Sequence, residues 1–496
     1  MNAAPLRDEL CRIVGRAHVL EGRAELLPYA TDANRMFRGL PLLVVCPADT
    51  GETAAVVEAC RRAGVGFVPR GAGTGLSGGA TPGDGEVVLS LARMRRILSV
   101  DPADRTAVVQ PGVINAHLSR EVAPLGLYYA PDPSSQSACT IGGNVAENSG
   151  GAHCLKYGVT TNHVLGLEVV LPDGRVVRTG RLGPPCHGYD LTGLFCGSEG
   201  TLGVVTAVCV RLLPRPRAVA TALAMFRAVD AAAEAVEQIT AAGEVPAALE
   251  MMDRNAMTAV ERGRYPVGYP DDARAVLLVE FDGLRQGLDD QVEAAMAICR
   301  RCGVAEVRAA AGDAERALWW NNRKAAFAAM GAIARSYYVA DGVIPRTALV
   351  AVLAEVGEIS ADARLWTANV FHAGDGNLHP LMAYDPTIPG EPERVLRAGS
   401  AMMAACVRAG GAVSGEHGVG LEKRDELYYL FDEQDMAVQR GVHDLFDPAD
   451  RANPGKMYPL PGRCAEVRRA AWDPRATIGR PGAGSADPAG RRRADP

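Results

Sequence analysis

The 496-residue sequence contains no long hydrophobic run and no excess of basic residues. No stretch reaches the roughly eighteen apolar residues of a membrane-spanning helix, so we expect no membrane span. The first residues lack the apolar core of a signal peptide, which predicts a cytoplasmic protein. The net charge of −6 and the lack of a basic stripe with interleaved aromatic residues argue against nucleic-acid binding.

The composition predicts an ordinary globular protein. With 48% hydrophobic and 22% charged residues, a chain of this length should form two or three domains. The twelve cysteines are scattered too widely for a disulfide framework and indicate reduced, mostly buried thiols. The single CxxC motif, Cys299 and Cys302, ends a helical pattern and is expected to be structural. Only four lysines occur, all in stretches with other distinctive features: Lys156, Lys324, Lys423 and Lys456.

The sequence does contain a glycine-rich run at residues 69–79, the first of three. Its backbone N–H groups can surround an anion because few Cβ atoms obstruct them, and Arg70 adds a charge suited to phosphate. Residues 73–78 match G-x-G-x-x-G, but strand-like residues 87–91 follow where a Rossmann fold needs a helix. The lysine of an ATP-binding P-loop is also missing. The run therefore predicts a phosphate-binding loop between two strands.

Two further runs have the same character. The second run, residues 139–151, is rich in Gly, Ser and Asn without periodicity, and we expect irregular backbone around a ligand. The third run, residues 196–203, precedes an apolar strand at 204–213. Between them, residues 167–178 form a predicted hairpin that turns at Pro172-Asp173-Gly174. The short strands and turns indicate an α+β arrangement rather than regular βαβ repetition.

The C-terminal half contains two histidine motifs that predict a metal site. Asp375-Gly376 is a hairpin signal, and closing this hairpin brings His372 and His379 together. Glu416, flanked by glycines in the 414–420 motif, completes a two-histidine, one-carboxylate site with open positions. Zinc, manganese and iron all suit these ligands, and the pattern does not choose among them.

Charged residues near these motifs are candidates for catalysis. His417 would remain free as a general base, since an unperturbed imidazole has a pKa of about 6.5. Arg323-Lys324 follows two tryptophans on a predicted helix, and composition alone would leave this pair facing solvent.

Taken together, the motifs resemble the FAD-linked oxidases of the vanillyl-alcohol oxidase superfamily. They are most similar to the group that contains the flavin-binding chain of glycolate oxidase and the D-lactate and D-2-hydroxyglutarate dehydrogenases. The resemblance implies an α+β fold with a two-subdomain PCMH-type FAD-binding domain, a ferredoxin-like antiparallel-sheet cap domain and a C-terminal helical segment. The expected regions are an N-terminal helical segment (1–37), the FAD-binding domain (38–216), the substrate or cap domain with the metal-binding hairpin (217–410), the C-terminal helical segment completing the active site (411–460) and a disordered tail (461–496).

The resemblance also implies how FAD is held. In such proteins the first run binds the FAD pyrophosphate, and the other two line the adenine side and the flavin. Many members bond the flavin covalently to a histidine of the first run. Thr74 stands at the matching position here, which implies non-covalent FAD. The expected cofactor-binding residues are Pro69, Arg70, Gly71, Ala72, Gly73, Thr74, Gly75, Leu76, Ser77, Pro133, Ser134, Thr140, Gly143, Asn144, Asn148, Ser149, Gly150, Glu199, Gly200, Val205 and Asn453.

The implied activity is the oxidation of a small D-2-hydroxy acid (glycolate, D-lactate or D-2-hydroxyglutarate) by hydride transfer to flavin N5. The resemblance assigns Arg323 to the substrate carboxylate, with Lys324 beside it, and His417 to the hydroxyl proton. The expected electron acceptor is an iron–sulfur subunit, a quinone or an electron-transfer flavoprotein, and a partner subunit could hold the protein at a membrane surface. Two alternatives remain: a metal-dependent hydrolase whose glycine runs bind a nucleotide, and an inactive flavin-carrying subunit.

Overall fold

The computed structural model describes residues 4–183 and 188–459, which belong to one unit of the chain, Met1–Pro459. The disordered tail predicted at 461–496 lies outside the described residues. Among the described residues, no helix combines the length and apolar character needed to cross a membrane.

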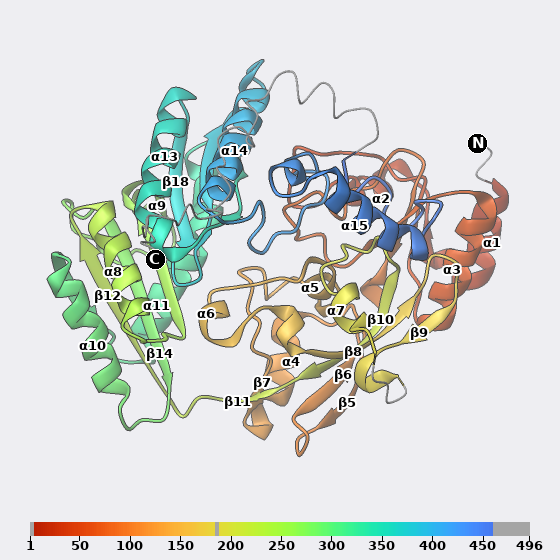
Figure 1. Ribbon diagram of the computed structural model, residues 1–496. Helices are drawn as coiled ribbons and strands as arrows, with labels where there is room; N and C mark the ends of the chain where they lie inside the picture. Colours follow the sequence, from red (N-terminus) through yellow and green to blue (C-terminus); the bar gives the residue numbers. More distant parts are fainter. Residues whose placement is uncertain (1–3, 184–187, 460–496) are drawn as a thin grey trace, which may run out of the picture. The chain divides into compact units, whose positions relative to one another are not determined.

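The N-terminal part of the chain, coloured red to orange in Figure 1, forms a sheet that leads into the first glycine run. Its order is β1-β2-β4-β3, with bounds β1 (Val19–Leu20), β2 (Leu43–Val45), β3 (Phe67–Arg70) and β4 (Val87–Ser90). Both β2 and β3 pair with β4 in parallel, and helix α3 (Thr50–Ala63) makes the crossover from β2 to β3. Helix α1 (Ala4–Val14) packs beside α3. The predicted strand–loop–strand arrangement of the first run is confirmed, because no helix separates β3 from β4.

The second sheet is antiparallel and includes the predicted hairpin. Its order is β5-β6-β10-β8-β9, with bounds β5 (Ile97–Asp101), β6 (Thr106–Val109), β8 (Val164–Val170), β9 (Val176–Arg178) and β10 (Val204–Arg211). Helices α4 (Asn115–Val122) and α5 (Ile141–Glu147) contribute Leu118, Ile141 and Val145 to the core of this sheet. A short pair, β7 (Leu127–Tyr128) and β11 (Leu213–Pro214), precedes the cap.

Helix α5 corrects the expectation of irregular backbone throughout the second run. The side chain of Thr140 caps the helix by accepting a hydrogen bond from the N–H of Gly143 at 3.2 Å. The helix ends at Asn148, which takes a left-handed φ of 49°. Burial of Ile141 and Val145 stabilises this turn of helix, although Gly142 and Gly143 have low helix propensity.

The cap has the predicted ferredoxin-like arrangement. Its first four strands form the order β15-β12-β14-β13, with every neighbouring pair antiparallel. In chain order the elements are β12 (Ala218–Phe226), α8 (Val229–Ala241), β13 (Ala248–Asp253), α9 (Arg254–Glu261), β14 (Ala275–Gly283), α10 (Leu288–Arg301) and β15 (Val304–Ala309). Alternate residues of β12 belong to different hydrophobic cores. Ala224 lies in the core formed with α8 and α10, and Leu223 lies in the core formed with α9. Cys299 and Cys302 are buried free thiols, which agrees with a structural motif.

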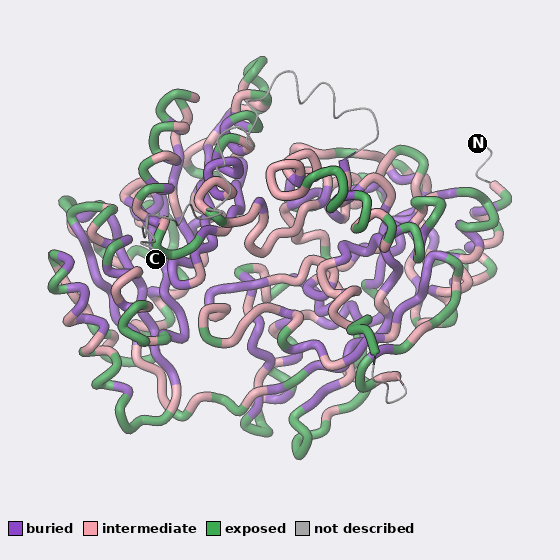
Figure 2. Tube along the Cα trace, viewed as in Figure 1, coloured by how far each residue is buried: buried purple, intermediate pink, exposed green. Residues whose placement is uncertain are grey.

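The second half of the cap extends this sheet and carries the histidine hairpin. The elements are α11 (Asp313–Lys324), α12 (Ala326–Ala329), β16 (Ser336–Val339), β17 (Gly342–Val343), α13 (Leu349–Asp362), β18 (Trp366–His372), β19 (Asn377–Leu378), β20 (Pro380–Tyr384) and α14 (Glu391–Arg408). Strand β18 pairs with β13 and with β20. Buried residues therefore run continuously through both sets of strands (Figure 2).

The C-terminal segment returns to the first half of the chain. Helix α15 (Glu433–Phe446) places Phe446 edge-on against Phe195, with ring centroids 5.6 Å apart. Beyond it, Ala452 forms a parallel bridge with Phe67 of β3, and the Phe67 N–H donates to the Arg451 carbonyl at 2.8 Å. Segments far apart in the sequence therefore meet beside the first glycine run.

His153 joins the N-terminal half of the chain to the cap sheet. Its Nδ1 lies 2.8 Å from Asp132 Oδ2, and its Nε2 lies 3.3 Å from Glu280 Oε1 in β14. The imidazole also stacks on Trp320, with centroids 5.3 Å apart. Burial alone would lower the pKa of His153, but the two carboxylates raise it to about 10.

This raised pKa predicts a pH-dependent stability. Since the folded pKa lies above the ordinary value of about 6.5, the stabilisation is complete below pH 6.5 and disappears as pH rises toward 10. We expect His153→Gln to lose about 1–3 kcal/mol of unfolding free energy at pH 6, with a smaller loss at pH 9. Denaturant titrations measure this, with exposed His117→Gln as control. A loss independent of pH would contradict the charged bridge.

Candidate active site

All three glycine runs meet at one cavity of about 460 Å³. The cavity is lined by most of the residues expected to bind the cofactor: Pro69, Arg70, Gly71, Ala72, Gly73, Thr74, Gly75, Leu76, Pro133, Ser134, Thr140, Gly143, Asn144, Ser149, Glu199, Gly200 and Val205. Its other wall comes from the cap and the C-terminal segment and consists of Lys324, Phe327, Ala328, Tyr337, His379, Glu416 and His417. The cavity thus joins the glycine runs to the histidine motifs.

The first run is folded tightly against its neighbours. A Cβ added to Gly71 would lie 2.3 Å from Thr140 Oγ1, so a side chain there would separate the first run from α5. The sequence suggested that Arg70 offers a free positive charge to bound phosphate. In the structure its guanidinium is instead bound to main-chain carbonyls. Its Nη1 donates to the Ala80 carbonyl at 3.0 Å and its Nη2 to the Thr31 carbonyl at 2.9 Å. Arg70 therefore holds the two ends of the loop through main-chain carbonyls.

Four expected cofactor residues lie outside the cavity lining and brace the loops instead. Asn453 Nδ2 donates to the carbonyls of Gly79 at 2.8 Å and Glu199 at 2.6 Å, which joins the first and third runs. The Ser77 carbonyl accepts from the Leu421 N–H at 2.9 Å.

The other two brace the second run. Asn148 Oδ1 accepts from the Thr161 N–H at 2.9 Å. Gly150 packs against Glu416, so closely that a Cβ on it would lie 2.7 Å from Glu416 Oε2.

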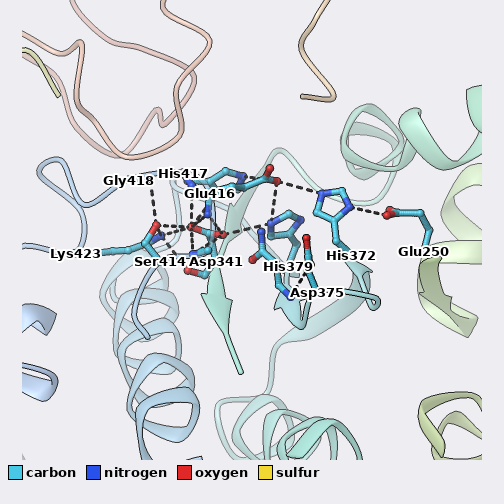
Figure 3. Close-up of polar contacts among 12 residues, drawn as sticks. Glu250, Asp341, His372, Asp375, His379, Ser414, Glu416, His417, Gly418 and Lys423 are labelled. Carbon is cyan, nitrogen blue, oxygen red and sulfur yellow. Dashed lines mark hydrogen bonds and ion pairs between the residues drawn. The ribbon is translucent and has the colours of Figure 1, made fainter. Parts of the chain in front are cut away.

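The hairpin brings the two histidines together beside Glu416 (Figure 3). Glu416 Oε1 lies 3.2 Å from His372 Nε2 and 3.3 Å from His379 Nε2. His372 Nδ1 lies 2.7 Å from Glu250 Oε1, so a proton on Nδ1 leaves Nε2 free as a ligand atom. Neither ring nitrogen of buried His379 makes a hydrogen bond to a described residue. The donor set fits a divalent metal, because the His379 imidazole makes no hydrogen bond within the described chain although two carboxylates lie within 3.4 Å of its Nε2.

A second group, Asp341 with His379 and His417, is also close enough for a metal. Asp341, however, already accepts hydrogen bonds from the Ser414 hydroxyl at 2.8 Å and Lys423 Nζ at 2.7 Å. Although burial alone would raise the pKa of Asp341, Lys423 holds it well below its usual range. With its charge balanced by Lys423, Asp341 is the weaker metal ligand.

A third group consists of His443, Asp447 and Asp450 near the end of α15. Here Asp447 Oδ2 accepts two backbone N–H groups, from Arg451 and Ala452, both at 2.6 Å. This carboxylate holds the turn that follows α15, so it is less available to a metal than Glu416.

His417 lies beside His379 in the wall of the cavity. Its ring stacks on His379 with centroids 4.8 Å apart, and its Nδ1 makes no hydrogen bond to a described residue. Burial lowers the pKa of His417 to about 4, so the imidazole is neutral near pH 7. A neutral imidazole that lines a cavity can accept a proton.

The Arg323-Lys324 pair is split between two environments. Arg323 is buried, with its Nη2 2.5 Å from Glu250 Oε2. Lys324 lines the cavity, and its Nζ lies 5.6 Å from the centre of the Trp320 ring. Lys324, rather than Arg323, is therefore the cation exposed to the cavity.

Sequence reasoning missed Glu250, Asp341 and Lys423 as parts of this site. Glu250 interrupts the apolar strand β13 and is only 1% exposed. A carboxylate within an apolar stretch was the one feature of the sequence that could have marked Glu250 as a site residue. Asp341 and Lys423 are each at most 1% exposed. Their pairing over 82 positions leaves no local signature.

Comparison with known proteins identifies the family of the chain. Residues 215–457 match the family "FAD linked oxidases, C-terminal domain", and residues 41–180 match "FAD binding domain". The chain is 46% identical over 448 residues to glycolate oxidase subunit GlcD of Escherichia coli (strain K12), covering 90% of each protein. It is 33% identical over 425 residues to a D-lactate dehydrogenase of Anaerostipes hadrus, covering 84% of this chain and 89% of the relative.

The fold is also found among solved structures. Substrate-bound p-cresol methylhydroxylase has a TM-score of 0.74 at 17% identity, covering 92% of this chain and 96% of that chain. At this identity the likeness concerns the fold alone. The matches confirm the α+β, PCMH-type fold and the family resemblance expected from the sequence.

Proposed function

Since the chain belongs to the FAD-linked oxidases, we propose that it oxidises a small D-2-hydroxy acid, such as glycolate, D-lactate or D-2-hydroxyglutarate, to the 2-oxo acid. The observation that carries this proposal is the shared cavity, in which His379, Glu416 and His417 face the glycine runs. FAD, when bound by these runs, supplies the hydride acceptor. The hydrolase alternative lacks support, because the family is one of FAD-linked oxidoreductases.

The residues around the cavity have separate proposed tasks. His372, His379 and Glu416 would hold a divalent metal (zinc, manganese or iron), which would polarise the substrate hydroxyl. His417, whose side chain lines the cavity, takes the hydroxyl proton. Glu250 keeps His372 in the tautomer that a metal needs, and Arg323 balances the charge of Glu250. Half-buried Phe327 and Tyr337 exclude water from the cap side.

We assign the substrate carboxylate to Lys324, with Arg323 acting behind it. Lys324→Met is expected to raise KM about 10–100-fold with a smaller change in kcat, because a binding interaction to a charged group is lost. Steady-state kinetics with a 2-hydroxy acid and an artificial electron acceptor measure this. The control is Arg316→Met, which removes a positive charge from the same helix outside the cavity lining and should keep the parental KM. An unchanged KM in Lys324→Met would refute the assignment.

The flavin is proposed to be non-covalent, because Thr74 lines the cavity at the position where related proteins attach it. Acid precipitation should release all flavin into the supernatant. We also propose that the electrons pass to an iron–sulfur subunit, a quinone or an electron-transfer flavoprotein. Cytoplasmic location, with attachment to a membrane surface through such a partner, is part of this proposal.

A substrate panel tests the proposed reaction. Glycolate, D-lactate, L-lactate and D-2-hydroxyglutarate are compared at equal concentration with an artificial acceptor. Turnover with at least one D-acid or glycolate, and little with L-lactate, is the expected result. Absence of turnover with every acid would favour the inactive flavin-carrying subunit.

A further inference from the structure

The 414–420 loop carries Glu416 and His417, and its backbone N–H groups are bound by side-chain oxygens. Every backbone N–H from Gly415 to Gly420 donates to one of three side chains. Asp341 accepts from the first three of these groups, with the shortest distance, 3.0 Å, to the His417 N–H. Such a run has neither helical nor strand pairing to hold it, so its conformation depends on these acceptors.

The remaining N–H groups are bound from elsewhere. Ser414 Oγ accepts from the Gly418 N–H at 3.0 Å. Glu199 accepts from the Val419 N–H at 2.6 Å and from the Gly420 N–H at 2.7 Å, one with each carboxylate oxygen. The loop is thus held at its start by Asp341 and at its end by Glu199.

The two carboxylates come from different halves of the chain. Asp341 lies between β16 and β17 of the cap and is 0% exposed in its side chain. Glu199 lies in the third glycine run, between α7 (Leu191–Phe195) and β10, and also lines the cavity. Lys423 balances the charge of Asp341, with Nζ 2.7 Å from Oδ2 (Figure 3).

Close packing leaves the loop little freedom. A Cβ added to Gly415 would lie 2.1 Å from Asn377 Oδ1, and one added to Gly420 would lie 2.2 Å from the Ser77 carbonyl oxygen. Gly418 has a φ of 84°, which favours glycine. The backbone therefore passes closely between the histidine hairpin and the first glycine run.

We propose that Asp341 and Glu199 are positioning residues that clamp the 414–420 loop from the cap and from the FAD-binding half. The clamp sets the place of Glu416 and His417 relative to both the histidine pair and the cavity. Its importance for catalysis rests on the proposed function, whereas the clamp itself concerns only the order of the loop.

Hydrogen exchange tests the clamp directly in the FAD-loaded protein without substrate or added metal. In Asp341→Asn and in Glu199→Gln, exchange of peptides covering 414–420 should rise about tenfold or more, while peptides covering β8 keep their protection. The control is Asp253→Asn, which alters another buried carboxylate that accepts a backbone N–H, from Ala256 at 2.8 Å, outside this loop. Asp253→Asn should leave exchange of 414–420 at the parental rate.

A kinetic readout separates positioning from general stabilisation. Both clamp variants should lower kcat about tenfold or more and change KM less. The proposed base His417 is misplaced in these variants, whereas Lys324, proposed to bind the substrate carboxylate, keeps its position. Ser414→Ala removes only one acceptor and should show a smaller rise in exchange of the 414–420 peptides. If Asp341→Asn does not fold, Ser414→Ala and Glu199→Gln test the clamp in its place. Parental protection of 414–420 in both Glu199→Gln and Ser414→Ala, or equal loss of protection in β8, overturns the proposal. An inactive parental enzyme would refute the proposed function and leave the exchange result intact.

Discussion

Replacing His417 with alanine is expected to lower the rate of flavin reduction by substrate about 100–10,000-fold while FAD remains bound. The physical reason is the loss of the neutral imidazole that lines the cavity next to His379. The cofactor should stay in place because the glycine runs, and not His417, form most of the cavity wall. Anaerobic stopped-flow absorbance measures the rate, and the flavin-to-protein absorbance ratio measures occupancy.

A buried histidine away from the cavity provides the matched control. His163 Nε2 lies 2.9 Å from the Tyr157 carbonyl oxygen, and the residue does not line the cavity. His163→Ala should lose stability but reduce its flavin at close to the parental rate. If His417→Ala reduces its flavin as fast as the parental enzyme, another group accepts the proton.

Removal of the proposed divalent metal is expected to have an effect of similar size. Chelation should abolish turnover, and one divalent ion per chain should restore it, because polarisation of the hydroxyl contributes several kcal/mol to the reaction. His379→Ala should contain no metal, since it removes an imidazole that Glu416 and His372 cannot replace. Elemental analysis of dialysed protein measures the content.

The control for this experiment is His443→Ala, which alters the group near the end of α15. It should retain the full metal content of the parental protein. If His443→Ala loses the metal and His379→Ala retains it, the metal site is the group of His443, Asp447 and Asp450. Full turnover after complete chelation would show that His372 and His379 have a structural role and do not bind a metal that turnover requires.

Much of this site could be predicted because its signals are local. The Asp375-Gly376 turn predicts that His372 and His379 meet, and their ring centroids lie 5.2 Å apart. The G-x-G-x-x-G match without a following helix correctly predicted a loop between β3 and β4. The ferredoxin-like order was expected from the family resemblance, and the strands β12 to β15 have it.

Other features depend on packing that the sequence does not encode locally. Arg323 and Lys324 are consecutive on α11 and point about 100° apart, so which one reaches the cavity depends on how the helix packs. Helix α5 was missed since its glycines disfavour a helix, and burial against the second sheet outweighs that preference. The partners of Asp341 and Glu199 in the 414–420 loop are remote in sequence, so no local pattern shows them.

The proposed oxidation is best tested by anaerobic reduction of the bound flavin with a 2-hydroxy acid that carries either hydrogen or deuterium at C2. We expect the yellow colour to bleach in a single turnover and deuterium to slow the bleaching, because the C2 hydride is transferred to the flavin. A flavin that stays oxidised with every D-2-hydroxy acid and with glycolate would refute the proposed function.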